Sequence, residues 1–367
     1  MSNYYNPVKI IRTDDWFREL NFRIEDLNIS SPIIITTPGN RKRLNLNSKF
    51  NIDSIFSDVS NNPTFRDCRN AIKFCRKNIF DGVVAIGGGS AMDLAKVVMS
   101  HLCLGEIEII KLIKNEIDYP QALPSIFLPT THGTASEVTM WGTVWDMKEK
   151  KKYSISHPAL YPKVAILDGH LTLSLPLDIS IITVLDALSH SLESIWNKNA
   201  NTTSTKYAIS AIGTILSNVD ALKKTPNDVK IRNSLLEAST TAGLAFSNTK
   251  TAAAHSISYP LTIHYGIPHG IASSISLIPL LEINGSEIQD SLNIICQNNK
   301  ITNKQLIQLI KSIPLDIIPY SLKEWHIPKN QIPNLVKESF TKGRMENNII
   351  DLTADDVNWI INEIYFS

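Results

Sequence analysis

Short apolar runs rich in Ile and Val alternate with helical patterns over the first half of the chain. Stretches 64–78 and 91–100 carry apolar residues at helical spacing. The β-branched runs between turn-forming residues predict strands at 31–36, 83–86, 125–128 and 164–167. Because such alternation is typical of α/β proteins, we expect a largely parallel sheet flanked by helices.

The pattern changes near Pro176. Beyond this residue few strand signals remain, and apolar residues recur at the spacing of long amphipathic helices. A chain of 367 residues is also too long for one small core. We therefore predict two domains, an α/β domain with a parallel sheet over residues 1–176 and an all-α domain over residues 177–367.

Composition narrows the class of protein. Hydrophobic residues make up 43% and charged residues 19% of the chain, which is ordinary for a folded enzyme. The formal net charge of +1 gives no reason to expect nucleic acid or an anionic membrane as a partner. No signal-peptide core, membrane-length apolar run or disulfide framework is visible, so we expect a cytoplasmic protein that does not bind membranes.

A glycine-rich turn follows the run that begins at Gly82. Gly87, Gly88 and Gly89 are succeeded by Ser90 and an amphipathic stretch, which predicts a strand, a tight turn in a glycine conformation and a helix N-terminus. Such a turn can approach and bind phosphate. It is neither the spaced-glycine dinucleotide fingerprint nor a Walker loop, so a plain strand-to-helix turn is an equal alternative.

Four residues have the chemistry of metal ligands. Asp186 and His190 are four apart, which places them on one face of a helix. His255 precedes Pro260, and His269 directly follows Pro268. Any one of these histidines alone is more simply a core or surface residue. Together they could form an N/O site that suits Zn(II) or Fe(II) better than Mg(II).

A loop rich in Ser and Thr follows the strand at 125–128. Small hydroxyl residues at the carboxyl end of a strand can donate to phosphate or ribose, and open α/β sheets bind ligands at this edge. The alternative is an ordinary connecting loop. The residues concerned are Thr130, Thr131, His132 and Thr134.

Taken together, these motifs resemble those of a known protein family. The runs GGGS-x-x-D-x-A-K and PTT-x-GT-x-SE, the D-x-x-x-H pair and a later PHG occur in order between Ile33 and about Pro279. The chain resembles the iron-containing (group III) alcohol dehydrogenases. This resemblance implies an N-terminal dinucleotide-binding domain and a C-terminal helical domain that binds metal and substrate.

The resemblance also implies roles for individual residues. Fe(II) or Zn(II) would be bound by Asp186, His190, His255 and His269, and the pyrophosphate by Gly87, Gly88, Gly89 and Ser90. Further cofactor contacts are expected at Thr37, Arg41, Asn62, Asp93, Thr130, Thr131, Thr134 and Lys152. The expected catalytic residues are Tyr259, His132 and Trp141.

Two positions depart from the family pattern. Tyr259 stands where many members have a histidine implicated in proton relay, and a phenol with a pKa near 10 is a poor base. Tyr259 could equally only pack, with His132 or His264 as other proton donors. The strand at 31–36 lacks the Asp that many relatives have at its end, and the cations of 41–43 follow. This favours NADP(H) over NAD(H), unless these cations only form a solvated turn.

Four stretches resemble one branch of the family, the phosphonoacetaldehyde reductases of phosphonate biosynthesis. They are 141–146, 152–155, 193–201 and 255–261. Lys198, His132 and Trp141 are candidate contacts for the phosphonate. We therefore expect reduction of phosphonoacetaldehyde to 2-hydroxyethylphosphonate by a homodimer. The alternatives are a general short-chain alcohol or diol dehydrogenase and, less favoured, a nucleotide-binding protein without catalytic activity.

Overall fold

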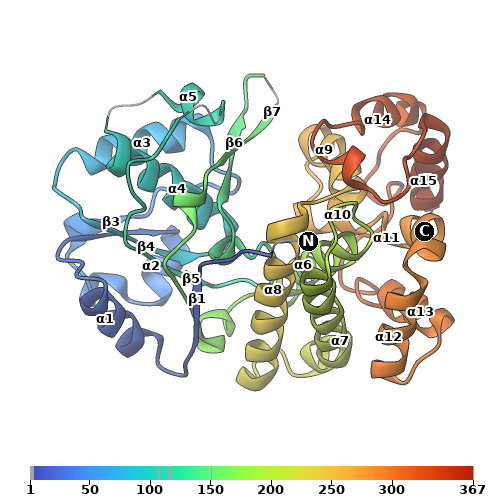
Figure 1. Cartoon of the computed structure of the whole chain (residues 1–367), viewed down its shortest axis with the longest axis horizontal. Helices are drawn as coiled ribbons and strands as arrows, with labels where there is room; N and C mark the ends of the chain where they lie inside the picture. The colour runs from blue at the N-terminus through green and yellow to red at the C-terminus, as the bar shows by residue number, and fades with distance from the viewer. Residues whose placement is uncertain (1–3, 106–107, 115–116, 150, 367) are drawn as a thin grey trace. The chain divides into compact units, whose positions relative to one another are not determined.

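The computed structural model describes residues 4–105, 108–114, 117–149 and 151–366. The chain forms two compact units, shown in the colour sequence of Figure 1. The α/β unit comprises Asn6–Thr131 and Ala135–Thr172. The helical unit comprises the chain from Leu173 onward, together with Tyr4, Tyr5 and the short segment His132–Thr134.

The α/β unit is built on a six-stranded sheet in the order β1-β8-β5-β4-β2-β3, with every pair parallel. The strands are β1 (Lys9–Arg12), β2 (Pro32–Thr36), β3 (Ile55–Phe56), β4 (Gly82–Gly87), β5 (Ser125–Pro129) and β8 (Val164–Leu167). The four predicted strands and the parallel sheet are confirmed. The sequence analysis missed β1 and β3, which are short strands at the two edges of the sheet.

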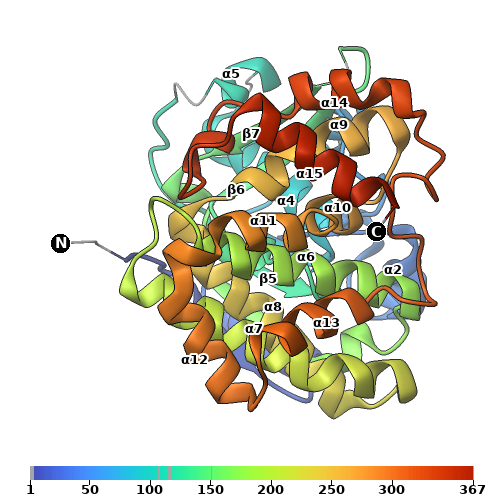
Figure 2. The same cartoon turned by 90° about the vertical axis from the view of Figure 1, so that its right-hand side faces the viewer.

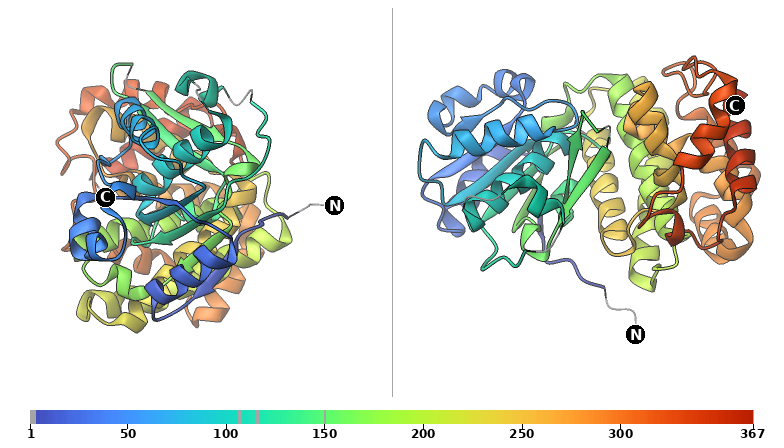
Figure 3. Two further views of the ribbon diagram at one scale, coloured as in Figure 1. Left: turned by 90° about the vertical axis from the view of Figure 1, so that its left-hand side faces the viewer. Right: turned by 90° about the horizontal axis from the view of Figure 1, so that it is seen from above.

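Helices cover both faces of this sheet, as Figure 3 shows. Ile33, Val83 and Phe127 pack on one face with α3 (Phe65–Cys75) and α4 (Gly89–Leu104). The next residues along the same strands, Ile34, Val84 and Leu128, pack on the other face with residues such as Leu20 of α1 (Trp16–Asp26). Burial on both faces is the reason that the strands are continuous apolar runs rather than alternating ones.

An antiparallel hairpin lies outside the main sheet. Its strands are β6 (Trp141–Asp146) and β7 (Lys151–Ser156), and the sequence analysis did not predict them. Val144 and Ile155 are buried in the same core as α4, while Thr143, Ser154 and Ser156 beside them are half-buried. The unit is completed by two short helices, α2 (Pro38–Arg43) and α5 (Ile109–Ile113).

The described part of the helical unit contains no strand, only an isolated bridge between Asn197 and Asn348, which confirms the predicted all-helical fold. Figure 2 shows its helices from the side of α11 and α13. They are α6 (Leu177–Ile195), α7 (Thr202–Lys224), α8 (Val229–Thr249), α9 (Ala253–Tyr265), α10 (His269–Ser274), α11 (Leu277–Asn284), α12 (Gln289–Asn299), α13 (Asn303–Ser312), α14 (Ile332–Glu338) and α15 (Ala354–Phe366). None of the helices in the described ranges has both the length and the apolar character that crossing a bilayer requires.

Candidate metal centre and cofactor-binding strand ends

Helix α6 carries the first pair of candidate metal ligands. From Ser180 onward almost all of its residues are buried, and Asp186 and His190 lie one turn apart within this buried stretch. The Asp186 carboxylate accepts a hydrogen bond of 3.0 Å from the Ser273 hydroxyl of α10. The local fold therefore fixes this carboxylate inside the protein rather than leaving it in solvent.

The other pair comes from α9 and α10. His255 lies in the first turn of α9, and His269 is the first residue of α10. Gly270 follows, and a Cβ atom added to it would lie only 2.0 Å from the Ile182 carbonyl oxygen of α6. Helix α10 thus packs against α6 at a separation that only glycine permits, and this contact brings His269 close to Asp186.

Three of the four candidate ligands converge. His255 Nε2 is 3.7 Å and His269 Nε2 is 3.8 Å from Asp186 Oδ1, and all three ligand atoms lie within 4.8 Å of one another. Ligands bound to one ion at about 2.0–2.2 Å are themselves roughly 3–4 Å apart. His255 Nε2 is also buried without a hydrogen-bond partner among the described residues. These features fit a divalent metal ion.

His190 lies beside this group rather than within it. Its ring stacks on Phe246 with centroids 4.0 Å apart, and its centroid is 4.7 Å from that of His255. Burial lowers the pKa of His190 to about 4, so its imidazole is neutral, as a metal ligand must be. The structure therefore gathers Asp186, His255 and His269 and places the fourth predicted ligand next to them.

Glu193 is a residue of the candidate metal centre that the sequence did not reveal. Its fully buried carboxylate accepts hydrogen bonds of 3.0 Å from the backbone N–H groups of Ala252 and His255 and also contacts His255 Nδ1. This contact directs His255 Nε2 toward Asp186. Burial opposes protonation of His255, but the two carboxylates raise its pKa to about 9. The site therefore favours a positive charge, which a metal ion would supply in place of the proton that His255 would release. The spacing of Asp186, His190 and Glu193 along one helix face was the signal that could have revealed it.

Replacing Glu193 with glutamine is expected to weaken metal binding by about 10- to 100-fold, because a partner that orients a ligating histidine commonly contributes that much. The amide would keep the size of the side chain but lose the charge. The test is the metal content of purified protein after dialysis against buffered Zn(II). Glu363→Gln, an exposed change on α15, is the control. Equal metal affinity of the two variants would show that Glu193 has no positioning role.

Several of the predicted cofactor residues lie at the carboxyl ends of three adjacent strands. Thr37 follows β2 and caps α2, Gly87 ends β4, and Thr130 follows β5. The Thr130 N–H donates to the Gly87 carbonyl at 3.0 Å. Helix α4 begins at Gly89 without a side-chain cap, so the N–H groups of its first turn can bind an anion. The uncapped helix start at this edge is compatible with the phosphate binding that the sequence predicts.

The expectation that the turn needs a glycine backbone conformation was wrong. Gly88 has φ −83° and ψ −169°, which other residues can adopt. The constraint is the space around the turn. A Cβ added to Gly87 would lie 2.6 Å from the Cβ of Ala91, and a Cβ added to Gly88 would lie 3.0 Å from Cγ2 of Thr131. The glycines are therefore required by the close packing of the turn on its own surroundings.

Other predicted cofactor residues already have protein partners. The Ser90 hydroxyl accepts from the Asn62 backbone N–H at 3.1 Å. Asp93 accepts from the Ser136 hydroxyl at 2.9 Å and lies beside the buried Lys96. Burial raises the pKa of Asp93, although Lys96 opposes this rise. Asp93 is thus part of an internal polar network of the α/β unit.

Arg41 and Lys152 lie in different parts of the α/β unit. Arg41 donates to Asn47 Oδ1 at 2.8 Å and to the Ser57 hydroxyl at 3.1 Å, both of which are neutral. Lys152 Nζ lies 5.6 Å from the centroid of the Trp145 ring. Thr134 belongs to the helical unit rather than to the α/β unit.

The three candidate catalytic residues have different surroundings. His132, in the helical unit, is fully buried, and both ring nitrogens are without partners in the described part of the chain. Burial and the charge of Arg232 lower its pKa to about 3, so it is neutral. Burial raises the pKa of Tyr259 to about 12, which makes it a poor base. The Trp141 carbonyl at the start of β6 accepts from Lys96 Nζ at 2.7 Å.

Two other residues named from the sequence contact nearby carboxylates. Lys198 Nζ contacts Asp351, so its charge is already compensated. His264 Nε2 is 2.5 Å from the Glu338 carboxylate. Neither arrangement favours the anion-binding or proton-donating role that the sequence suggested.

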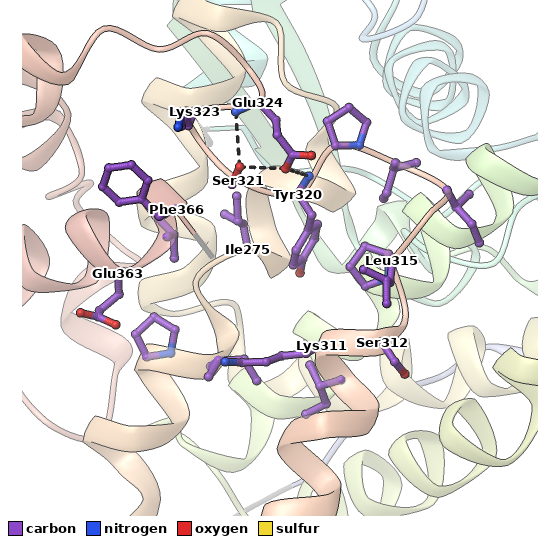
Figure 4. A pocket seen from close by; sticks show the side chains of 18 of the residues that line it. Ile275, Lys311, Ser312, Leu315, Tyr320, Ser321, Lys323, Glu324, Glu363 and Phe366 are labelled. Atoms are coloured by element: carbon purple, nitrogen blue, oxygen red, sulfur yellow. Dashed lines mark hydrogen bonds between the residues drawn. The ribbon is translucent and has the colours of Figure 1, made fainter.

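A large cavity of about 1390 Å³ lies elsewhere in the helical unit (Figure 4). Apolar residues such as Ile275 and Leu315 line it together with Lys311, and none of the four predicted metal ligands does. Glu324 accepts from the Ser321 hydroxyl at 2.7 Å at its edge. The cavity is therefore separate from the candidate metal centre.

Comparison with known proteins connects this geometry to a family. Residues 7–169 match the model of the iron-containing alcohol dehydrogenases, and residues 180–365 match the C-terminal model of the same family. The sulfoacetaldehyde reductase of Bifidobacterium kashiwanohense, solved in complex with NAD+, is 30% identical. The match covers 99% of this chain and 98% of that one, with a TM-score of 0.90.

Two further relatives are named for different substrates. Long-chain-alcohol dehydrogenase 1 of Geobacillus thermodenitrificans is 29% identical over 79% of this chain and 76% of its own length. The phosphonoacetaldehyde reductase of Streptomyces viridochromogenes is 31% identical over 56% of this chain, and the match spans about half (53%) of that relative. The matched family models and the relatives place the chain among enzymes that oxidise alcohols or reduce aldehydes with a nicotinamide cofactor. The chain belongs to the iron-containing alcohol dehydrogenase family.

Proposed function

We propose that this protein reduces phosphonoacetaldehyde to 2-hydroxyethylphosphonate, using a divalent metal ion and a nicotinamide cofactor. The observation that carries the metal-dependent chemistry is the cluster of the buried Asp186 and His255 with the half-buried His269, in which His255 Nε2 has no hydrogen-bond partner among the described residues. Support for the substrate comes from relatives named for aldehydes with a tetrahedral anionic group. Phosphonate biosynthesis in the cytoplasm is the setting that we propose.

Four residues would hold Fe(II) or Zn(II): Asp186, His190, His255 and His269. When bound, the ion would act as a Lewis acid on the carbonyl group of the substrate. The chain prepares this site in two ways. Glu193 orients His255, and Ser273 fixes the Asp186 carboxylate. Burial of Asp186, His190 and His255 shields them from water and strengthens their electrostatic effect, while His269 is half-buried.

For the nicotinamide cofactor we propose NADP(H) ahead of NAD(H). The residues that would bind it are Thr37, Arg41, Asn62, Gly87, Gly88, Gly89, Ser90, Asp93, Thr130, Thr131, Thr134 and Lys152. No carboxylate follows β2, and the neutral partners of Arg41 leave its charge available to a 2′-phosphate. The NAD+ complex of the Bifidobacterium enzyme supports the alternative. Tighter binding of NADH than of NADPH would contradict the preference.

Gly88→Val is expected to weaken cofactor binding by on the order of 10-fold or more. The branched side chain would displace Thr131, a proposed cofactor contact, from the glycine turn that precedes α4. Fluorescence titration with NADPH measures the dissociation constant. Gly213→Val on α7 is the control, since an added Cβ there meets Asn299 at an ordinary 3.6 Å. An unchanged dissociation constant in folded Gly88→Val would show that the glycine turn does not bind the cofactor.

Relative rates test the substrate. We expect kcat/KM for phosphonoacetaldehyde to exceed that for butyraldehyde by more than the ~10-fold that a methylene group is worth, because contacts with a remote anion help to position the carbonyl. Added salt should lower the phosphonoacetaldehyde rate more than the butyraldehyde rate. Equal or faster turnover of butyraldehyde or propanediol would instead favour a general alcohol dehydrogenase, as the longer match to the Geobacillus enzyme does.

We also propose the catalytic contacts, the domain boundaries and the oligomeric state. The catalytic contacts that we propose are Tyr259, His132 and Trp141, with Tyr259 binding substrate rather than acting as a base. The α/β domain would extend over 1–176 and the helical domain over 177–367. We also propose that the protein is a homodimer, which light scattering would test.

A further inference from the structure

Tyr259 lies close to the candidate metal centre along a single helix. It follows His255 by four residues on α9, which places the two side chains on the same face, one turn apart. One helical turn is ~5.4 Å. A two-carbon aldehyde with an anionic group at its far end has about this reach, so its two ends could meet successive turns of α9.

Hydrogen bonds connect the loop that follows α14 to the start of α9. The Thr341 backbone N–H donates to the Ser256 hydroxyl at 3.0 Å, and Ser256 in turn donates to the Ser339 carbonyl at 2.5 Å. Asn347 donates to the Thr251 carbonyl at 2.9 Å. These bonds on both sides of Arg344 hold that residue in place beside α9.

The guanidinium of Arg344 lies over the ring of Tyr259, with Cζ 4.6 Å from the ring centroid. Arg344 is half-buried, and in the described ranges no carboxylate is within ion-pair distance of its side chain. Glu346, the nearest acid in sequence, instead accepts from the backbone N–H groups of Gly343 and Arg344. The positive charge is therefore held in place but not neutralised.

We propose that Arg344, whose guanidinium packs on the Tyr259 ring, binds the anionic group of the aldehyde substrate, which is either a phosphonate or a sulfonate. The proposal rests on the proposed function and names the residue that selects for the anionic substrate. A planar guanidinium can donate two parallel hydrogen bonds to such an anion, and the tyrosine ring limits its rotation. Lys198, the cation suggested by the sequence, is occupied by Asp351.

The test compares Arg344→Met with Lys342→Met. Both changes remove one positive charge from the same loop, but Lys342 is exposed. The measured quantity is the ratio of kcat/KM for phosphonoacetaldehyde to kcat/KM for butyraldehyde. We expect Arg344→Met to lower this ratio by on the order of 10- to 100-fold, the range of a charge-assisted hydrogen bond. Lys342→Met should leave the ratio as in the wild type, and Arg344→Lys should fall between the two.

A second arm measures binding without turnover. Calorimetric titration with ethylphosphonate and with ethanesulfonate should show that Arg344→Met weakens both, and the wild-type protein should reveal which anion binds more tightly. Sulfoacetaldehyde as a third substrate separates the two anions in turnover.

The outcomes distinguish the two levels of the proposal. If the wild type prefers neither anionic aldehyde over butyraldehyde, the proposed function fails and the Arg344 assignment fails with it. If the wild type prefers an anionic aldehyde but Arg344→Met keeps the same ratio and the same affinity for the anion, the assignment of Arg344 is wrong and the function stands.

Discussion

His255→Ala is expected to lose nearly all of the bound metal and most of the turnover while the protein stays folded. The variant removes one of three converging ligands and leaves the Glu193 carboxylate buried without its imidazole partner. Loss of a ligand should weaken metal binding by at least ~100-fold. The aldehyde reduction rate should fall by about 1000-fold, since a Lewis acid supplies several kcal/mol of transition-state stabilisation.

The metal-to-protein ratio and the rate of NADPH oxidation measure these two effects, and circular dichroism checks the fold. His170→Ala is the matched control, because that histidine is exposed in the α/β unit, where its ring contacts Asp168. A folded His255→Ala protein with wild-type metal content would contradict the assigned ligand set.

The second large effect is expected at Gly270. Gly270→Ala would place a methyl group 2.0 Å from the Ile182 carbonyl oxygen, so α10 would have to move away from α6. Strain against a rigid backbone should lower the free energy of unfolding by about 3 kcal/mol. Because His269 begins α10, the same movement should also reduce metal affinity.

Urea denaturation with and without added metal separates these two consequences. Gly213→Ala is the control in the middle of α7, where an added Cβ makes only ordinary contacts. That variant should gain about 0.5–1 kcal/mol, as alanine normally does over glycine inside a helix. If Gly270→Ala were as stable as the wild type, the close packing of α10 on α6 would not be what positions His269.

The main sheet could be predicted because its central strands are buried on both faces. Runs such as 83–86 are unbroken apolar segments that end in turn residues, and they formed β4 and its neighbours as expected. The edge strand β3 has two residues and offers no such run. The β6–β7 hairpin escaped prediction because Val144, Trp145 and Ile155 are the only buried apolar side chains of its two strands, so its apolar pattern is weak.

Part of the candidate site could also be predicted, because some of its residues stand out in the sequence. Asp186, His255 and His269 have chemically distinctive side chains in recognisable motifs. The roles that we propose for Glu193, Gly270 and Arg344 depend on tertiary contacts. Glu193 contacts the start of α9, Gly270 the α6 backbone and Arg344 the ring of Tyr259. Spacing along the sequence gives no information about how closely two helices approach or where a distant loop is anchored.

The central claim is that a metal ion at Asp186, His255 and His269 is required for reduction of an anionic aldehyde. The most direct measurement is the rate of phosphonoacetaldehyde reduction by NADPH in metal-free protein, followed through stepwise addition of Fe(II) or Zn(II). The account predicts no turnover in the chelated protein and recovery in proportion to metal, complete at about one ion per chain. Full turnover in the chelated protein would contradict it.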